Sequence, residues 1–289
     1  LMSEIFSDYY YPGITENRHK LFYDYIISSN DAFITRWLLE EFLVPSVSSI
    51  NVMPFCADNI EKWINITENK DENEQELGID ALVSFFVSDI VTSISPLPVT
   101  KSFSRPIILR ILEQLNPTDK KWQTQTVIFS MLIYFLQHSY FLIEESDVEE
   151  IIWNYISPAL LNPNTNVQDS ASTLLSFIFS NFGSIRVKIS IFSDMFQKML
   201  FDKDSLQRIA GAKGLFAIIS STLIFDDVPD YIVSAFTSLS TASEIDSSVS
   251  ECINQFFSDF WSIHEENFTE NAAIALSPFK DSIRPSYIS

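Results

Sequence analysis

The chain has 289 residues, of which 46% are hydrophobic and 14% are aromatic, so it can bury a sizeable core and is not a disordered chain. Its formal net charge of −20 argues against direct binding of nucleic acid or of an anionic membrane, because both attract clustered Lys and Arg; basic partners are favoured instead. The two cysteines, Cys56 and Cys252, lie far apart without a metal-ligand spacing, so the sequence implies neither a disulfide framework nor a zinc site, and a reducing compartment fits.

The first residues, LMSEIFSDYYYPG, lack the basic start and the apolar segment of a signal peptide. No apolar run reaches the roughly 18 residues that a membrane helix needs, so we expect a soluble protein. Because Leu1 precedes Met2, the chain is either a piece of a longer protein or carries an artefact of its production.

In chain order, apolar spacing predicts helices in the first half of the chain over parts of 16–44, 57–67, 74–94, 105–115 and 120–140. The acidic stretch 68–76 separates two of these helices and is interpreted as a solvated loop, with a docking site for a basic partner as the alternative. Glycine is too scarce, and wrongly placed, for β-hairpins.

In the second half, several polar clusters predict helix starts. These clusters are Ser146 to Glu149, Asp204 to Gln207, Asp227 with Pro229, and Asn267 to Glu270. The fold predicted from these signals is all-α.

A repeat is visible in the same region. Asn166 to Ser172 aligns with Ser205 to Gly211 at an offset of 39 residues, and a weaker third copy places Ile245 and Val249 in the same stripe. A period near 40 residues, filled by two helices per copy, is typical of an α-solenoid of HEAT-like helix pairs. Chance alignment of amphipathic helices is the alternative.

No arrangement of residues indicates catalysis. The three histidines, His19, His138 and His264, form no metal-binding pair, and no phosphate-binding loop or nucleophile elbow occurs. The run Gly211-Ala-Lys-Gly214 lies inside a predicted helix, where small residues let neighbouring helices approach closely. We therefore expect a protein that is not an enzyme and that needs no cofactor and no metal.

From Ser205 onward the sequence contains an Arg-x-Ala-Gly helix, a Val228-Pro229 turn, a helix with Phe257, Phe260, Trp261 and His264, a Phe268-Thr-Glu270 start, and the ending RPSYIS. In this order of parts the chain resembles the C-terminal region of the large single-chain HEAT-repeat proteasome activators, the proteasome activator subunit 4 family. The resemblance covers about Asn116 to Ser289. It implies C-terminal armadillo-like HEAT repeats over 116–289. Residues 1–115 carry no resemblance, and their less regular helix signals predict an irregular helical solenoid segment.

The resemblance also implies a function. Members of that family cap the 20S proteasome without ATP or ubiquitin, in the nucleus and the cytoplasm, by inserting their C-terminal tail between α subunits of the proteasome ring. The matching residues are Pro285, Ser286, Tyr287, Ile288 and Ser289. Proline stiffens such a tail before it binds, and the terminal carboxylate can pair with a pocket lysine.

The tail departs from the family pattern, because Ile288 stands where those proteins have a penultimate tyrosine. Docking is therefore expected, whereas gate opening is in doubt. The alternative is that Tyr287 folds back on the last helix pair.

In animal members of the family, the region around a Ser/Cys-Asn-Phe step is linked to acetylated histones, and Asn181 and Phe182 occupy the matching place. The two interpretations of Asn181 are an acetyl-lysine site and a helix C-cap before Gly183. A third class of function is a general HEAT scaffold or transport-type adaptor that binds basic partners.

Overall fold

The computed structural model describes residues 112–113, 115–139, 143–222 and 228–280, together with Ile64 and Glu68. The chain divides into two compact units, Leu1–Glu144 and Glu145–Ser289. The boundary predicted after residue 115 lies within the first unit and stays a prediction. In the described residues of both units every regular element is a helix and none is a strand, so the predicted all-α class is confirmed for this part of the chain.

In the first unit, the predicted helix over 120–140 is present as α10 (Trp122–Ser139). Its start is fixed by a long-range contact, because the Lys121 backbone N–H donates to both carboxylate oxygens of Glu68, at 3.0 and 3.2 Å. The buried side chains of α10 include Ile128, Phe129, Leu132 and Leu136, which recur at the spacing of one helix face. The other helices predicted in the first half lie almost entirely outside the described residues.

The second unit begins with one continuous helical run, in which a π-helical segment joins two α-helices. The run consists of α11 (Glu145–Ile151), η3 (Ile152–Ile156) and α12 (Ser157–Leu160). Pro158 sits in the first turn of α12, where a missing N–H is tolerated. Because α11 begins at Glu145, Ser146 lies inside the helix and is not the N-cap that the sequence predicted.

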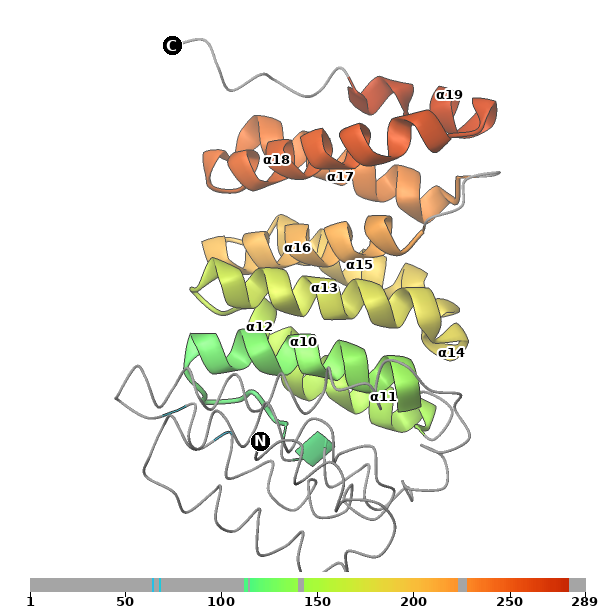
Figure 1. The fold of residues 1–289 in the computed structure, drawn as a ribbon. Coiled ribbons are helices and arrows are strands. Elements are labelled where there is room, and N and C mark those ends of the chain that lie inside the picture. The colour runs from blue at the N-terminus through green and yellow to red at the C-terminus, as the bar shows by residue number, and fades with distance from the viewer. Residues whose placement is uncertain are drawn as a thin grey trace, which may run out of the picture. The chain divides into compact units, whose positions relative to one another are not determined.

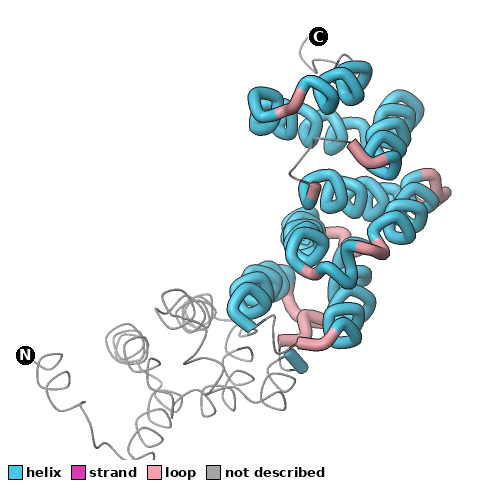
Figure 2. Tube along the Cα trace, turned by 90° about the vertical axis from the view of Figure 1, so that its right-hand side faces the viewer, coloured by secondary structure: helices cyan, strands magenta, loops and turns pink. Residues whose placement is uncertain are grey.

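Six longer helices of the second unit form two rows. One row holds α13 (Thr165–Asn181), α16 (Ser205–Ser221) and α18 (Ser247–His264); the other holds α15 (Ile189–Leu200), α17 (Asp230–Ile245) and α19 (Glu270–Lys280). Within the first row α16 contacts both α13 and α18, and within the second row α17 contacts both α15 and α19. Figure 1 shows these helices stacked layer on layer, and Figure 2 shows the same rows from the side.

Two short helices complete the second unit. They are α14 (Gly183–Arg186), which follows α13, and the 3₁₀ turn η4 (Glu265–Asn267), which precedes α19. The α15 and α16 helices are packed directly against each other.

The three helices of the first row begin in the same way. The side chains of Asn164, Asp204 and Asp246 each accept a hydrogen bond from the backbone N–H two residues later, at 3.0, 2.9 and 2.8 Å. These N-caps lie 40 and 42 residues apart in the chain. Asp204 was predicted as a helix start, and the structure confirms it.

The buried stripe of each helix keeps a fixed register to its N-cap. In α13 the buried residues Val167, Ala171, Leu175 and Ile178 begin three positions after the cap, and in α18 Val249, Ile253, Phe257 and Phe260 do the same. In α16 three of the four matching positions, Gly211, Leu215 and Ile218, are buried and Gln207 is half-buried. This register differs from the 39-residue alignment, which wrongly placed Ile245 in the stripe: Ile245 ends α17 and is 70% exposed.

The last helix, α19, starts later than the sequence predicted. Asn267 belongs to η4, whereas the Thr269 hydroxyl accepts a hydrogen bond from the Ala272 backbone N–H at 3.3 Å. α17 begins at Asp230, directly after the predicted Pro229, which provides no side-chain cap, and Asp227 lies outside the described residues. Both predicted helices are therefore present, and the start of α19 is shifted.

Candidate functional site

The predicted docking tail, Pro285 to Ser289, lies outside the described residues, and its role stays a prediction. The structure does show what precedes it. Leu276 of α19 is fully buried, the Phe279 ring stacks on Phe236 at a centroid distance of 5.4 Å, and Lys280 pairs with Glu265 of η4. These contacts hold α19 onto the last two layers as far as residue 280.

The aromatic residues that carry the family resemblance form a core rather than an exposed surface. Phe236 of α17 is fully buried and contacts four rings, those of Phe257, Phe260, Trp261 and Phe279, at centroid distances of 5.3 to 6.4 Å. Such aromatic contacts stabilise beyond the area that they bury. The cluster joins α17, α18 and α19 into one block.

His264 lies at the edge of this cluster. Its ring centroid is 5.0 Å from that of Phe260, and partial burial lowers its pKa below the usual value of 6.5. Burial removes water from the ring, which disfavours the charged form. His264 is therefore expected to be neutral at physiological pH and to serve packing.

The predicted acetyl-lysine residues, Asn181 and Phe182, lie at the end of α13, and a ligand-binding role for them stays a prediction. Asn181 is exposed, and its side-chain amide Nδ2 donates to the Phe177 carbonyl of its own helix at 2.8 Å. Phe182 is buried and is itself the C-cap of α13 and the N-cap of α14. Asn181 is therefore the last residue of α13, with its amide N–H engaged locally, and the C-cap is the residue after it.

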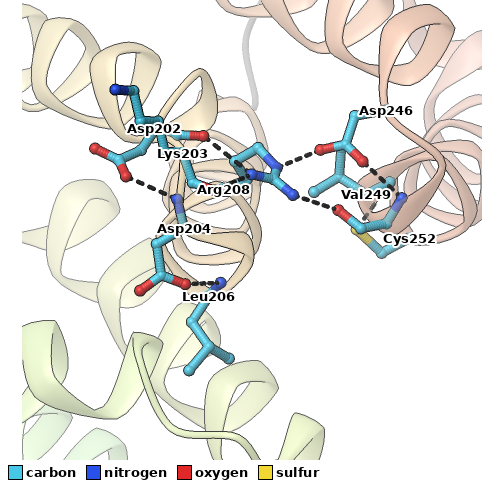
Figure 3. A network of polar contacts seen from close by, with 9 residues as sticks. Asp202, Lys203, Asp204, Leu206, Arg208, Asp246, Val249 and Cys252 are labelled. Atoms are coloured by element: carbon cyan, nitrogen blue, oxygen red, sulfur yellow. Dashed lines mark hydrogen bonds and ion pairs between the residues drawn. The ribbon is translucent and has the colours of Figure 1, made fainter.

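The principal polar site lies between α16 and α18, with Arg208 at its centre (Figure 3). The guanidinium Nη1 donates to the Lys203 and Asp202 carbonyls at 2.8 and 3.1 Å, and Nη2 donates to the Ser248 hydroxyl at 3.3 Å. Its Nε contacts the Asp246 carboxylate as an ion pair, without the geometry of a hydrogen bond. One side chain thus ties the loop before α16 to the start of α18.

Asp246 is both the N-cap of α18 and the partner of Arg208. Hydrogen bonds from the Ser248 hydroxyl and backbone N–H, and then the positive charge of Arg208, hold the pKa of Asp246 below its usual value of 3.8. The two side chains are 21% and 25% exposed, so water screens the pair only in part. Asp246 therefore stays ionised in mildly acidic solution.

Further polar contacts join neighbouring layers. The Ser172 hydroxyl of α13 donates to the Lys213 carbonyl of α16 at 2.8 Å, and the Lys213 ammonium pairs with Asp169. In the other row, Gln197 Oε1 of α15 accepts hydrogen bonds from the Ser234 and Ser238 hydroxyls of α17 at 3.2 and 3.1 Å. These bonds satisfy polar groups in the contacts between layers and fix the register of the rows.

A cluster of opposite charges links α11 to the start of α15. Lys188, the N-cap of α15, pairs with Glu145 at 2.8 Å and also with Glu149. Hydrogen bonds from the ammonium, first to Glu145 and then to Glu149, raise the pKa of Lys188 to about 12. This lysine stays charged across the physiological range.

Among the described residues no three His, Cys, Asp or Glu side chains gather in a way that could hold a metal ion. Cys252, the described cysteine, is largely buried, and burial raises the pKa of its thiol. A thiol in that state is a poor nucleophile. No described helix is both long and apolar enough to cross a membrane.

The Arg208 site was not predicted from the sequence. The available signal was an Asn or Asp followed by a Ser or Thr, which recurs as Asn164-Thr165, Asp204-Ser205 and Asp246-Ser247. That dipeptide locates the caps, but the pairing of a cap with an arginine some 40 residues earlier depends on how the layers stack.

Comparison with protein-family models and with curated proteins found no match for this chain.

Proposed function

We propose that this chain is a non-catalytic HEAT-like solenoid that caps the 20S proteasome and docks its C-terminal tail between subunits of the α ring. The support has two parts. The order of sequence elements from Ser205 to Ser289 resembles that of the family of HEAT-repeat proteasome activators. The described second unit consists of stacked helix layers with recurring caps at Asn164, Asp204 and Asp246.

The recurring register carries the solenoid part of the proposal. Buried positions keep the same distance from each N-cap, and the middle helix of each row, α16 or α17, contacts both of its row neighbours. A stack in which each layer buries its face on the next is the basis of a solenoid with a period near 40 residues. Such a scaffold holds a docking tail at a defined distance from the rest of the interface, so that several weak contacts act together.

A second candidate is a scaffold or transport-type adaptor for basic partners, favoured by the net charge of −20. The two candidates respond differently to changes at the tail and to salt. Binding of basic cargo along a helical surface should weaken steeply with salt and should ignore the tail. Acetyl-lysine recognition by Asn181 stays a prediction from the sequence and is not part of this proposal.

The test is binding of the complete chain to immobilised 20S core particles at two salt concentrations, with a variant that has one glycine appended after Ser289. The extra residue removes the terminal carboxylate from its pocket. We expect the added glycine to weaken binding to the 20S particle about tenfold or more, because the carboxylate loses one charge-assisted contact. Equal binding of the two proteins, with a steep loss in salt, would instead support the scaffold.

A further inference from the structure

We propose that Ser277 is a phosphorylation site for a proline-directed Ser/Thr protein kinase. The local sequence is Ser277-Pro278-Phe279-Lys280, with a proline directly after the serine and a lysine three positions after it. Kinases of this class select proline at the first position because their binding groove offers no partner to a backbone N–H there, and many prefer a basic residue at the third. This inference does not rest on the proposed function.

The other Ser-Pro dipeptides of the sequence lack the basic residue. Ser95-Pro96 is followed at the third position by Pro98, and Ser157-Pro158 by Leu160. Leu160 is also buried, at 1% exposure. Ser157-Pro158 is therefore a matched control within the second unit.

All three recognition residues at Ser277 are accessible. Ser277 and Pro278 are exposed, and the Lys280 side chain is 48% exposed. They occupy the last turn of α19, which is the final helix of the described residues. A kinase can approach this turn without opening any buried layer.

Backbone hydrogen bonding in the last turn of α19 is interrupted, and one bond there is made by the phosphate acceptor itself. Pro278 has no N–H and so cannot donate to the Ile274 carbonyl four residues earlier. The Ser277 hydroxyl donates to that same carbonyl at 2.9 Å. Opening this proline-interrupted helix end to the extended form that a kinase binds costs the Phe279–Phe236 ring contact and the Lys280–Glu265 pair, while Leu276 can stay buried.

Phosphorylation would remove the bond that stabilises the turn. The Ser277 oxygen attacks the γ-phosphorus of ATP, the bond from that phosphorus to the β,γ-bridging oxygen breaks, ADP leaves, and the hydroxyl proton passes to the kinase's catalytic base. The product has no hydroxyl to donate to the Ile274 carbonyl. It also places negative charge at the C-terminal end of a helix, where the helix dipole disfavours it.

The new phosphate also competes for Lys280. Residues three apart on a helix face the same side, so Lys280 is within reach of a phosphate on Ser277. A phosphate dianion is a stronger partner for an ammonium than the Glu265 carboxylate that now pairs with it. We therefore infer that phosphorylation frees the end of α19 from η4.

The test uses the complete chain, a purified cyclin-dependent kinase and radiolabelled ATP, with the modified residue mapped by mass spectrometry. We expect Ser277 to carry most of the incorporated phosphate in the wild-type protein, Ser277→Ala to lose it, and Ser157→Ala to retain it. Lys280→Ala should slow incorporation about tenfold, equivalent to one charge-assisted contact to the kinase. Mapping on the unaltered protein keeps the result independent of whether a variant folds.

The structural consequence is read by hydrogen exchange of the segment 274–280. We expect faster exchange in the phosphorylated protein than in the unmodified one, with exchange in α13 unchanged. Preferential modification of Ser157, or equal incorporation in wild type and Ser277→Ala, would overturn the site. Modified Ser277 with unchanged exchange would overturn the release of α19.

Discussion

Two glycines of α16 set how closely this helix approaches α15. A Cβ added at Gly211 would lie 2.4 Å from the Leu200 backbone nitrogen, and one added at Gly214 would lie 2.3 Å from the Phe196 ring. Real side chains do not tolerate such contacts, so the two helices would have to move apart. The prediction that these small residues let neighbouring helices approach closely is confirmed by this geometry.

The first prediction follows from that contact. Gly211→Ala should lower the free energy of unfolding by about 3 kcal/mol, because the atom that it meets is backbone and cannot rotate away. Gly183→Ala is the control: no atom lies within 4 Å of its added Cβ, so the change should leave stability within about 1 kcal/mol of wild type. Urea unfolding followed by circular dichroism measures both. Equal stability of the two variants would show that α15 and α16 are not in close contact.

The ionisation of Asp246 should make the stability of the protein depend on pH. Because its folded pKa lies below the usual 3.8, ionised Asp246 contributes stability that is present above pH about 4 and is lost as the pH falls below that value. Asp246→Asn keeps the N-cap but cannot pair with Arg208 as an anion. We expect the wild type to be the more stable protein at pH 7 and the difference to shrink at pH 3.

The measurement is the urea midpoint of both proteins at the two pH values. Asp246→Ala serves as the comparison, since it should lose the cap as well, at a cost of about 1 kcal/mol at either pH. A difference between wild type and Asp246→Asn that is the same at pH 3 and pH 7 would contradict the assigned ionisation.

At the scale of elements, α18 is fixed by the aromatic cluster on one face, while its other face is in water. Phe257 is 1% exposed and stacks on Phe236 at 5.4 Å, whereas Ile263 of the same helix is 62% exposed. Phe257→Ala should cost about 3–5 kcal/mol of unfolding free energy, and Ile263→Ala less than about 1 kcal/mol. Thermal and urea unfolding compare the two, and similar losses would show that the cluster does not hold α17, α18 and α19 together.

The helices could be predicted from the sequence because caps and apolar spacing are local signals. Asp204 predicted the start of α16, and the apolar positions of 120–140 predicted α10. The boundary was less accurate where the cap is not an Asx side chain: α19 is capped by Thr269 and not by Asn267. Ile245 was misplaced because an alignment of apolar residues cannot distinguish the end of one helix from the stripe of the next.

Contacts between layers could not be predicted in the same way. In the chain, α17 lies between Arg208 and Asp246, and no local sequence pattern around either residue predicts that they pair. It follows from the stacking of α16 on α18, which is a long-range property of the fold.

At the scale of the whole molecule, the stacked layers would serve as the support of a docking tail. Ile288 replaces the tyrosine expected from the family resemblance. We therefore expect Ile288→Tyr to raise peptide hydrolysis by 20S particles at saturating concentrations of the chain, while its affinity for the particle changes little. Ile288→Val is the control, and equal hydrolysis with both variants would show that this position does not govern the gate.

The most direct test of the docking proposal is a native gel of purified 20S particles with a fluorogenic peptide overlay. It compares the complete natural protein with a variant that lacks Tyr287, Ile288 and Ser289. We predict that the intact protein shifts the particle and that the shortened one does not. An equal shift with both, or no shift with either, would contradict a docking role for the tail.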